Sequence, residues 1–155
     1  MPRDGGSEYR IGLEDEPSAE DRRKVIEGIK AYNARFTPRV PKLGLTLLLR
    51  DGGGEVRGGL LAETYWGWLF VDILWVDEPL RGQGHGGRLM RAAEEEAVRR
   101  GCAGAYLDTF DFQARPFYER LGYQLFGQLD DFPPGGSRYF LRKRLDPDPS
   151  TESHP

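Results

Sequence analysis

The stretch "LWVDEPLRGQGHGGRLM", Leu74–Met90, decides the fold of this chain. It places Gly82, Gly84, Gly86 and Gly87 within six residues, after an apolar run and before a segment with helical spacing. Glycines between a strand and a helix let backbone N–H groups approach a ligand closely, and the first turn of a helix offers unpaired N–H groups and a partial positive charge. The stretch therefore predicts a loop that binds an anionic group at the start of a helix.

Hydrophobic periodicity on either side of this stretch predicts a mixed α/β (α+β) layout. Trp68–Val76 is nearly all apolar, which predicts cover on both of its faces. The predicted strands are Tyr9–Leu13, Leu45–Arg50, Glu55–Glu63, Trp68–Val76, Gly104–Phe110, Tyr123–Leu129 and Ser137–Leu145, and the predicted helices are Ala19–Arg35, a helix from the glycines to Arg100, and Ala114–Leu121. The expected fold is a mostly antiparallel sheet of six or seven strands with helices on both faces.

Length and charge restrict the function. The 155 residues suit a single domain spanning 1–155, ordered over about 9–145, with 1–8 and 146–155 predicted to be disordered. The net charge of −3, from 22 basic and 25 acidic residues, lacks the basic excess of a nucleic-acid-binding protein. No apolar run approaches the ~20 residues of a membrane span. We therefore expect neither nucleic acid nor membrane as a partner.

Cysteine and histidine are too few for several kinds of chemistry. Cys102 is the single cysteine, so no internal disulfide can form, and we expect a cytoplasmic protein in which this residue packs. With His85 and His154 as the two histidines, no metal-ligand cluster is visible.

The glycines first suggest a dinucleotide site. Gly82, Gly84 and Gly87 fit G-x-G-x-x-G, and Asp108 follows Gly87 by 21 residues. However, Asp77–Arg81 separates the glycines from the preceding strand, and the chain has one strand–helix–strand unit where a Rossmann domain has two such halves. This interpretation is therefore the weaker one.

A different spacing fits better. Arg81, Gly84 and Gly86 match the pattern Q/R-x-x-G-x-G/A, and "DFQARPFYERLGY", Asp111–Tyr123, is similar to N-x-x-A-x-x-x-Y-e-k-x-G-F/Y. In motif order and in the surrounding strands, the chain from about Tyr9 to Leu145 resembles the GNAT superfamily of N-acetyltransferases. Asp111 departs from the pattern, because the family commonly has asparagine there.

This resemblance implies acetyl-CoA as cosubstrate and the GNAT fold. The pyrophosphate of acetyl-CoA would bind the backbone amides of Gln83–Gly87, and Arg81 and Arg88 would add positive charge. The pantetheine arm of acetyl-CoA would fill a gap where Trp68–Val76 splays from Gly104–Phe110. The predicted cofactor contacts are Leu74, Trp75, Val76, Arg81, Gly82, Gln83, Gly84, His85, Gly86, Gly87, Arg88, Asp111 and Ala114.

Acetyl transfer to an amine requires removal of a proton from the amine and donation of one to the leaving thiolate. The resemblance places Tyr118 near the CoA sulfur, as the acid. Asp72 is the only charged residue in "WLFVDILWV". Burial of an unpaired carboxylate is costly, so this group should be paired, hydrated or raised in pKa, and a raised pKa would suit a base. A structural hydrogen bond is the alternative role of Asp72. The expected reaction is direct transfer in a ternary complex.

The acceptor is less defined. We expect Glu63, Trp66, Trp68 and Asp108 to form an acidic, aromatic-walled pocket for a cationic amine. A polyamine, an aminoglycoside-like compound, an amino acid, a protein N-terminus and a lysine all stay open, and a homodimer is allowed. The alternative function is a non-catalytic acyl-CoA-binding or sensing module, against which the presence of both Asp72 and Tyr118 speaks.

Overall fold

The computed structural model describes residues 8–145, which divide between Arg39 and Val40 into two units. In the first unit, α1 spans Ala19–Asn33, and the Asp21 N–H donates a 3.0 Å hydrogen bond to the Ser18 hydroxyl at its N-cap. This cap satisfies one of the unpaired N–H groups of the first turn. Of the segments predicted to be disordered, 1–8 and 146–155, all residues except Glu8 lie outside the described residues.

The strand predicted at Tyr9–Leu13 is wrong. The segment has no regular secondary structure, and the side chains of Ile11 and Leu13 are fully exposed. Five alternating residues supply the side-chain pattern of a strand, but a strand forms only where a neighbour pairs with its backbone. The sheet of the described residues therefore has six strands.

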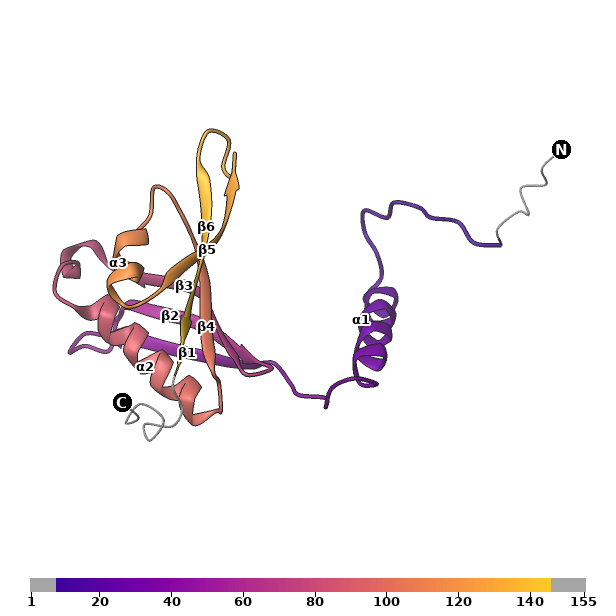
Figure 1. The fold of residues 1–155 in the computed structure, drawn as a ribbon, viewed down its shortest axis with the longest axis horizontal. Coiled ribbons are helices and arrows are strands. Elements are labelled where there is room, and N and C mark those ends of the chain that lie inside the picture. The colour runs from indigo at the N-terminus through magenta and orange to yellow at the C-terminus, as the bar shows by residue number, and fades with distance from the viewer. Residues whose placement is uncertain (1–7, 146–155) are drawn as a thin grey trace, which may run out of the picture. The chain divides into compact units, whose positions relative to one another are not determined.

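The second unit contains this sheet (Figure 1). Its strand order is β1-β2-β3-β4-β6-β5, and every neighbouring pair is antiparallel except the parallel pair of β3 and β4. This confirms the predicted mixed, mostly antiparallel sheet. The elements are β1 Leu43–Arg50, β2 Val56–Tyr65, β3 Trp68–Val76, the short 3-10 helix η1 Glu78–Leu80, α2 His85–Arg99, β4 Gly104–Phe110, α3 Arg115–Arg120, β5 Gln124–Asp130 and β6 Ser137–Arg144.

Polar turn residues fix the first hairpin. Asp51 Oδ1 accepts hydrogen bonds from the N–H groups of Gly53 (2.9 Å) and Glu55 (3.0 Å), so a single carboxylate closes the turn between β1 and β2. The glycine-rich turn predicted there is thus confirmed. Gly101 ends α2 with φ +84°, a left-handed conformation that glycine adopts without a Cβ penalty.

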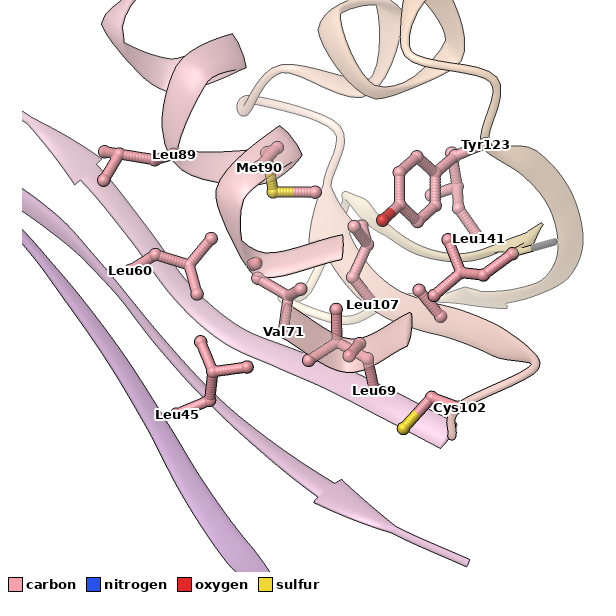
Figure 2. Close-up of a cluster of buried hydrophobic side chains, with 14 residues drawn as sticks. Leu45, Leu60, Leu69, Val71, Leu89, Met90, Cys102, Leu107, Tyr123 and Leu141 are labelled. Carbon is pink, nitrogen blue, oxygen red and sulfur yellow. The ribbon is translucent and has the colours of Figure 1, made fainter. Parts of the chain in front are cut away.

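The core lies between α2 and one face of the sheet. Figure 2 shows Met90 of α2 above Leu60, Val71 and Leu107 of the strands, and these four side chains are almost fully buried. Cys102 is buried in the same cluster, and burial raises the pKa of its thiol, which agrees with the predicted packing role.

Both helices of this unit, α2 and α3, lie on the same side of the sheet (Figure 1). On β3, Ile73 and Trp75 are each about half exposed. We expected both faces of β3 to be covered, and within this unit only one is. The expectation came from the nearly all-apolar sequence of the strand, which contains more apolar residues than positions that face the core.

Candidate active site

β3 and β4 begin side by side and then separate. Their parallel pairing covers Trp68–Val71 with Gly104–Leu107 and stops there. At the same level β3 contains a bulge, since its pairing with β2 skips Asp72. Val71 and Leu74 both face the core, which the strict alternation of a strand would forbid without that extra residue. The predicted splay is thus present, and Asp72 is the residue at which it begins.

A cleft of about 840 Å³ opens where the strands part. It runs from the glycine loop before α2 to the first turn of α3. Of the residues proposed from sequence, Asp72, Leu74, Val76, Arg81, Gly82, Gly84, His85, Gly86, Gly87, Asp108, Ala114 and Tyr118 line it. Ile73, Leu80, Thr109, Phe110, Phe112, Gln113, Phe117 and Arg120 also line it, and sequence reasoning missed them.

The glycine loop has the geometry of an anion site. Gly82 and Gly84 adopt φ +76° and +86°, and a Cβ on either would meet no atom within 4 Å, so a ligand can approach the backbone there. The first hydrogen bond into α2 runs from the Arg88 N–H to the Gly84 carbonyl at 3.1 Å. Within the described residues, the N–H groups ahead of it in α2 have no backbone acceptor. These groups suit the pyrophosphate of CoA.

Gly86 has a different reason to be glycine. A Cβ there would lie 3.2 Å from the Phe117 Cζ. The absent side chain therefore makes room for α3 against α2, and the expectation that Gly86 clears space for phosphate is corrected. Its N–H group still belongs to the helix N-terminus.

Three polar side chains near the loop make contacts within the protein, and of these only Arg81 also lines the cleft. Arg81 Nε donates to the Val76 carbonyl at 2.9 Å, which folds the arginine back onto the end of β3. Gln83 Nε2 donates to the Pro79 carbonyl at 3.2 Å. Arg88 Nη1 lies 3.3 Å from Nδ1 of His85 and lines another hollow, between α2 and β1. Gln83 and Arg88 thus do not line the cleft, and neither does Trp75.

Asp111 also lies outside the cleft. Its carboxylate oxygens are 3.1–3.2 Å from where a Cβ on Gly136 would be, so the side chain faces the β5–β6 hairpin. Two residues on, Gln113 lines the cleft, and its Oε1 accepts hydrogen bonds from the Thr109 hydroxyl (3.1 Å) and the Phe110 N–H (2.8 Å). The motif predicted a cofactor contact at Asp111. In the structure, the side chain that binds the end of β4 and lines the cleft is the amide of Gln113.

Tyr118 lies in the cleft, on α3. Its ring packs edge-on against Phe117 and Tyr123, at centroid distances of 5.1 Å and 6.2 Å. Burial raises the pKa of the Tyr118 hydroxyl, and the nearby charge of Asp108 raises it further. The phenol is therefore protonated at neutral pH and is available as a proton donor.

Asp72 and Asp108 are the two cleft-lining carboxylates of the splayed strands. Asp72 is exposed, because the bulge turns its carboxylate out of the core, so of the three expected states it has the hydrated one. Asp108 is half-buried. Its Oδ1 accepts a hydrogen bond from Arg138 Nε (2.8 Å) and lies 2.7 Å from Arg138 Nη2 in a salt bridge.

The other predicted acceptor residues lie elsewhere. Glu63, Trp66 and Trp68 line a separate hollow of about 230 Å³, together with Lys42, Tyr65, Phe70 and Tyr106. Lys42 Nζ lies 4.0 Å from a Glu63 carboxylate oxygen. The expectation that these residues share a pocket with Asp108 is wrong, because the β2–β3 hairpin places them around the start of β3, whereas Asp108 lies where β3 and β4 have parted.

Comparison with known proteins gives a consistent result. The pattern of the Acetyltransferase (GNAT) family matches residues 11–123. An acetyltransferase of Agrobacterium fabrum is 39% identical over 133 residues, covering 86% of this chain and 97% of the relative. The blasticidin-S acetyltransferase of Streptomyces morookaense is 47% identical over 93 residues, covering 59% and 68%.

Solved structures agree with the fold. An acetyltransferase from Bacillus cereus, at 31% identity, superposes with a TM-score of 0.79 and covers 86% of this chain and 98% of its own. The splayed strand pair and the glycine loop therefore lie in a fold that this chain shares with acetyltransferases. The chain belongs to the Acetyltransferase (GNAT) family. It is an acyltransferase, and acetyl-CoA is its cosubstrate.

None of the helices in the described residues is both long enough and apolar enough to cross a membrane.

Proposed function

We propose that the chain is an N-acetyltransferase that moves the acetyl group of acetyl-CoA directly to a primary amine of a small molecule, in a ternary complex. One observation carries the proposal: the cleft opened by the bulge at Asp72 joins the free N–H groups at the start of α2 to the protonated hydroxyl of Tyr118. The first feature suits the pyrophosphate of the cosubstrate, and the second suits its sulfur.

In the proposed reaction the amine nitrogen attacks the thioester carbonyl, a C–N bond forms and the C–S bond breaks. Tyr118 donates its proton to the leaving thiolate. The open backbone edge of β3 beyond Val71, which pairs with no residue of β4, is the proposed place for the acyl and pantetheine groups. Leu74 and Val76 of that edge line the cleft.

Asp72 is the proposed base. Its carboxylate is exposed and lines the cleft, so water can reach both it and an incoming amine. We propose that it takes the ammonium proton through a relaying water, because aspartate is short and lies on the strand rather than beside α3. When the C–N bond has formed, the nitrogen still carries one proton more than the amide keeps. That proton passes through solvent to reprotonate Tyr118, and the proton held by Asp72 leaves to bulk water, which closes the cycle.

For the acceptor, we propose a cationic small molecule held by Asp108. This carboxylate lines the cleft, and both contacts with Arg138 fall on its Oδ1, so its Oδ2 is the oxygen proposed to meet the amine. The blasticidin-S acetyltransferase relative makes blasticidin S the first acceptor to test.

The test is an assay of free thiol from acetyl-CoA with blasticidin S and a panel of polyamines, aminoglycosides, amino acids and peptides, with amide products identified by mass spectrometry. We expect thiol release to depend on the amine and to fall strongly in Tyr118→Phe. If CoA binds but no amine raises thiol release above hydrolysis, the chain is a non-catalytic acyl-CoA-binding module instead.

A further inference from the structure

Aromatic side chains gather at the Asp108 end of the cleft. Phe110 and Phe112 line it, and their rings are nearly parallel, with an interplanar angle of 3° and a centroid distance of 5.4 Å. Phe110 also stacks on Phe132 of the β5–β6 hairpin, at 5.7 Å and 24°. We name these three residues the aromatic shelf.

The inner part of the shelf is fixed by Arg138. Its guanidinium carbon lies 4.7 Å from the Phe132 ring centroid and 5.5 Å from that of Phe110. The same guanidinium is bound by Asp108. A planar cation held in place by a carboxylate thus supports two of the three rings, and the shelf is a preformed surface.

The outer part of the shelf is open. Phe112 is 72% exposed, whereas a large apolar ring at the rim of a cleft is normally covered when a ligand is bound. Its near-parallel stacking on Phe110 leaves one ring face for a further planar group. Asp108 lies two residues before Phe110 on β4, and both line the cleft with Phe112. A group stacked on Phe112 would therefore share this end of the cleft with a carboxylate that attracts an ammonium ion.

We propose that the acceptor carries a planar aromatic or heteroaromatic ring close to its reactive amine, and that Phe112 stacks on that ring while Asp108 attracts the amine. This inference rests on the proposed function, since it specifies the acceptor of the same site. Stacking of planar rings adds to simple burial of apolar area, so the shelf discriminates a flat ring from a saturated one of equal size.

The test compares benzylamine with cyclohexylmethylamine, two primary amines that differ in whether the ring is flat. Binding to the CoA-loaded protein is measured by calorimetry, and kcat/KM is measured by thiol release. We expect benzylamine to be preferred by about tenfold in both, the size of an aromatic stacking contribution. Phe112→Leu keeps an apolar side chain but removes the ring, and should reduce the preference to near one.

Two variants serve as controls. Phe112→Tyr keeps the ring and should keep the preference. Phe126→Leu removes a phenylalanine of β5 that is 48% exposed and pairs with Arg142, away from the cleft, and should change nothing. Three results would overturn the proposal that Phe112 stacks on an acceptor ring. They are equal affinity for the two amines, no detectable binding of either, and a preference that persists in Phe112→Leu. Ring-selective binding without acetyl transfer would support the stacking proposal and overturn the proposed function instead.

Discussion

Gly84 shows how one residue serves two demands. It is the N-cap of α2, and its φ of +86° is strained for any residue with a Cβ. We expect Gly84→Val to lower CoA affinity severely, because a branched side chain fills the space that phosphate needs, while circular dichroism shows a folded protein. The measurement is the Kd of CoA by calorimetry.

Gly54→Val is the matched control for that substitution. Gly54 has φ +82° and open space around its Cβ position, but it lies in the turn between β1 and β2. Both variants should lose about 1–3 kcal/mol of stability from backbone strain, and Gly54→Val alone should retain CoA affinity. Equal CoA affinities in Gly84→Val and Gly54→Val would mean that Gly84 serves only the backbone turn before α2.

Tyr118→Phe tests the proposed acid. Loss of a general acid typically costs about 10²–10⁴-fold in rate, so we expect kcat to fall within that range while the Kd of CoA changes little. Because burial and Asp108 raise the pKa of this hydroxyl above its ordinary value near 10, the wild-type kcat should not decline through tyrosine ionisation below about pH 10. Near-normal turnover in Tyr118→Phe, with chemistry limiting the rate, would make Tyr118 a packing residue.

Asp72→Asn tests the proposed base, since the amide has nearly the same shape and cannot take a proton. We expect kcat/KM at neutral pH to fall for an acceptor amine that arrives protonated, because the variant has no group at this position to take the proton. An acceptor amine of low pKa should be less affected, because it arrives already neutral. Equal kcat/KM values in wild type and variant with both amines would transfer the role to Asp108 or to water.

At the scale of elements, one polar cluster joins α2 to β6 and to the segment between α3 and β5. The Tyr123 hydroxyl donates to Glu94 Oε2 at 3.1 Å, and Lys143 Nζ lies 2.6 Å from Glu94 Oε1. Burial, with the charge of Glu94, raises the pKa of Tyr123 above its ordinary value. The cluster holds α2, and with it the glycine loop, against the sheet.

Tyr123→Phe should therefore lower the free energy of unfolding by about 1.5–3 kcal/mol at pH 7, the typical contribution of a hydrogen bond to a charged group. Because the folded-state pKa of Tyr123 is raised, its contribution is complete below the unfolded value near pH 10 and is lost as the pH rises beyond it. The difference between wild type and variant should thus narrow at alkaline pH. Urea denaturation at pH 7 and pH 10.5 measures it, and a difference that stays constant would contradict the assignment.

At the scale of the whole molecule, the cleft joins the ends of β3 and β4 to α2 and α3. A ligand that binds this native arrangement and not the unfolded chain raises the melting temperature by mass action. We expect a rise with CoA and acetyl-CoA, measured by differential scanning fluorimetry, and little change with NADH. Stabilisation by NADH alone would favour the dinucleotide interpretation of the glycines.

The sequence by itself determined the elements of the second unit and the chemistry of its loop. The glycines, Arg81 and the run Trp68–Val76 predicted a strand, an anion-binding turn and a helix, because these features depend on local backbone conformation and periodicity. The motif around Tyr118 and Ala114 likewise predicted that both line the cleft. The false strand at Tyr9–Leu13 marks the limit of such patterns, since pairing requires a partner elsewhere in the chain.

Only the tertiary structure decided which predicted residues meet. The bulge at Asp72 turns its side chain out of the core, and no local pattern predicts where a strand pair will skip a residue. The β2–β3 register takes Trp66 and Trp68 away from Asp108, while the β5–β6 hairpin brings Arg138 to it. Residues distant in sequence become neighbours through strand pairing and helix packing, which depend on the whole chain at once, so the acceptor end of the cleft follows from the fold rather than from any single motif.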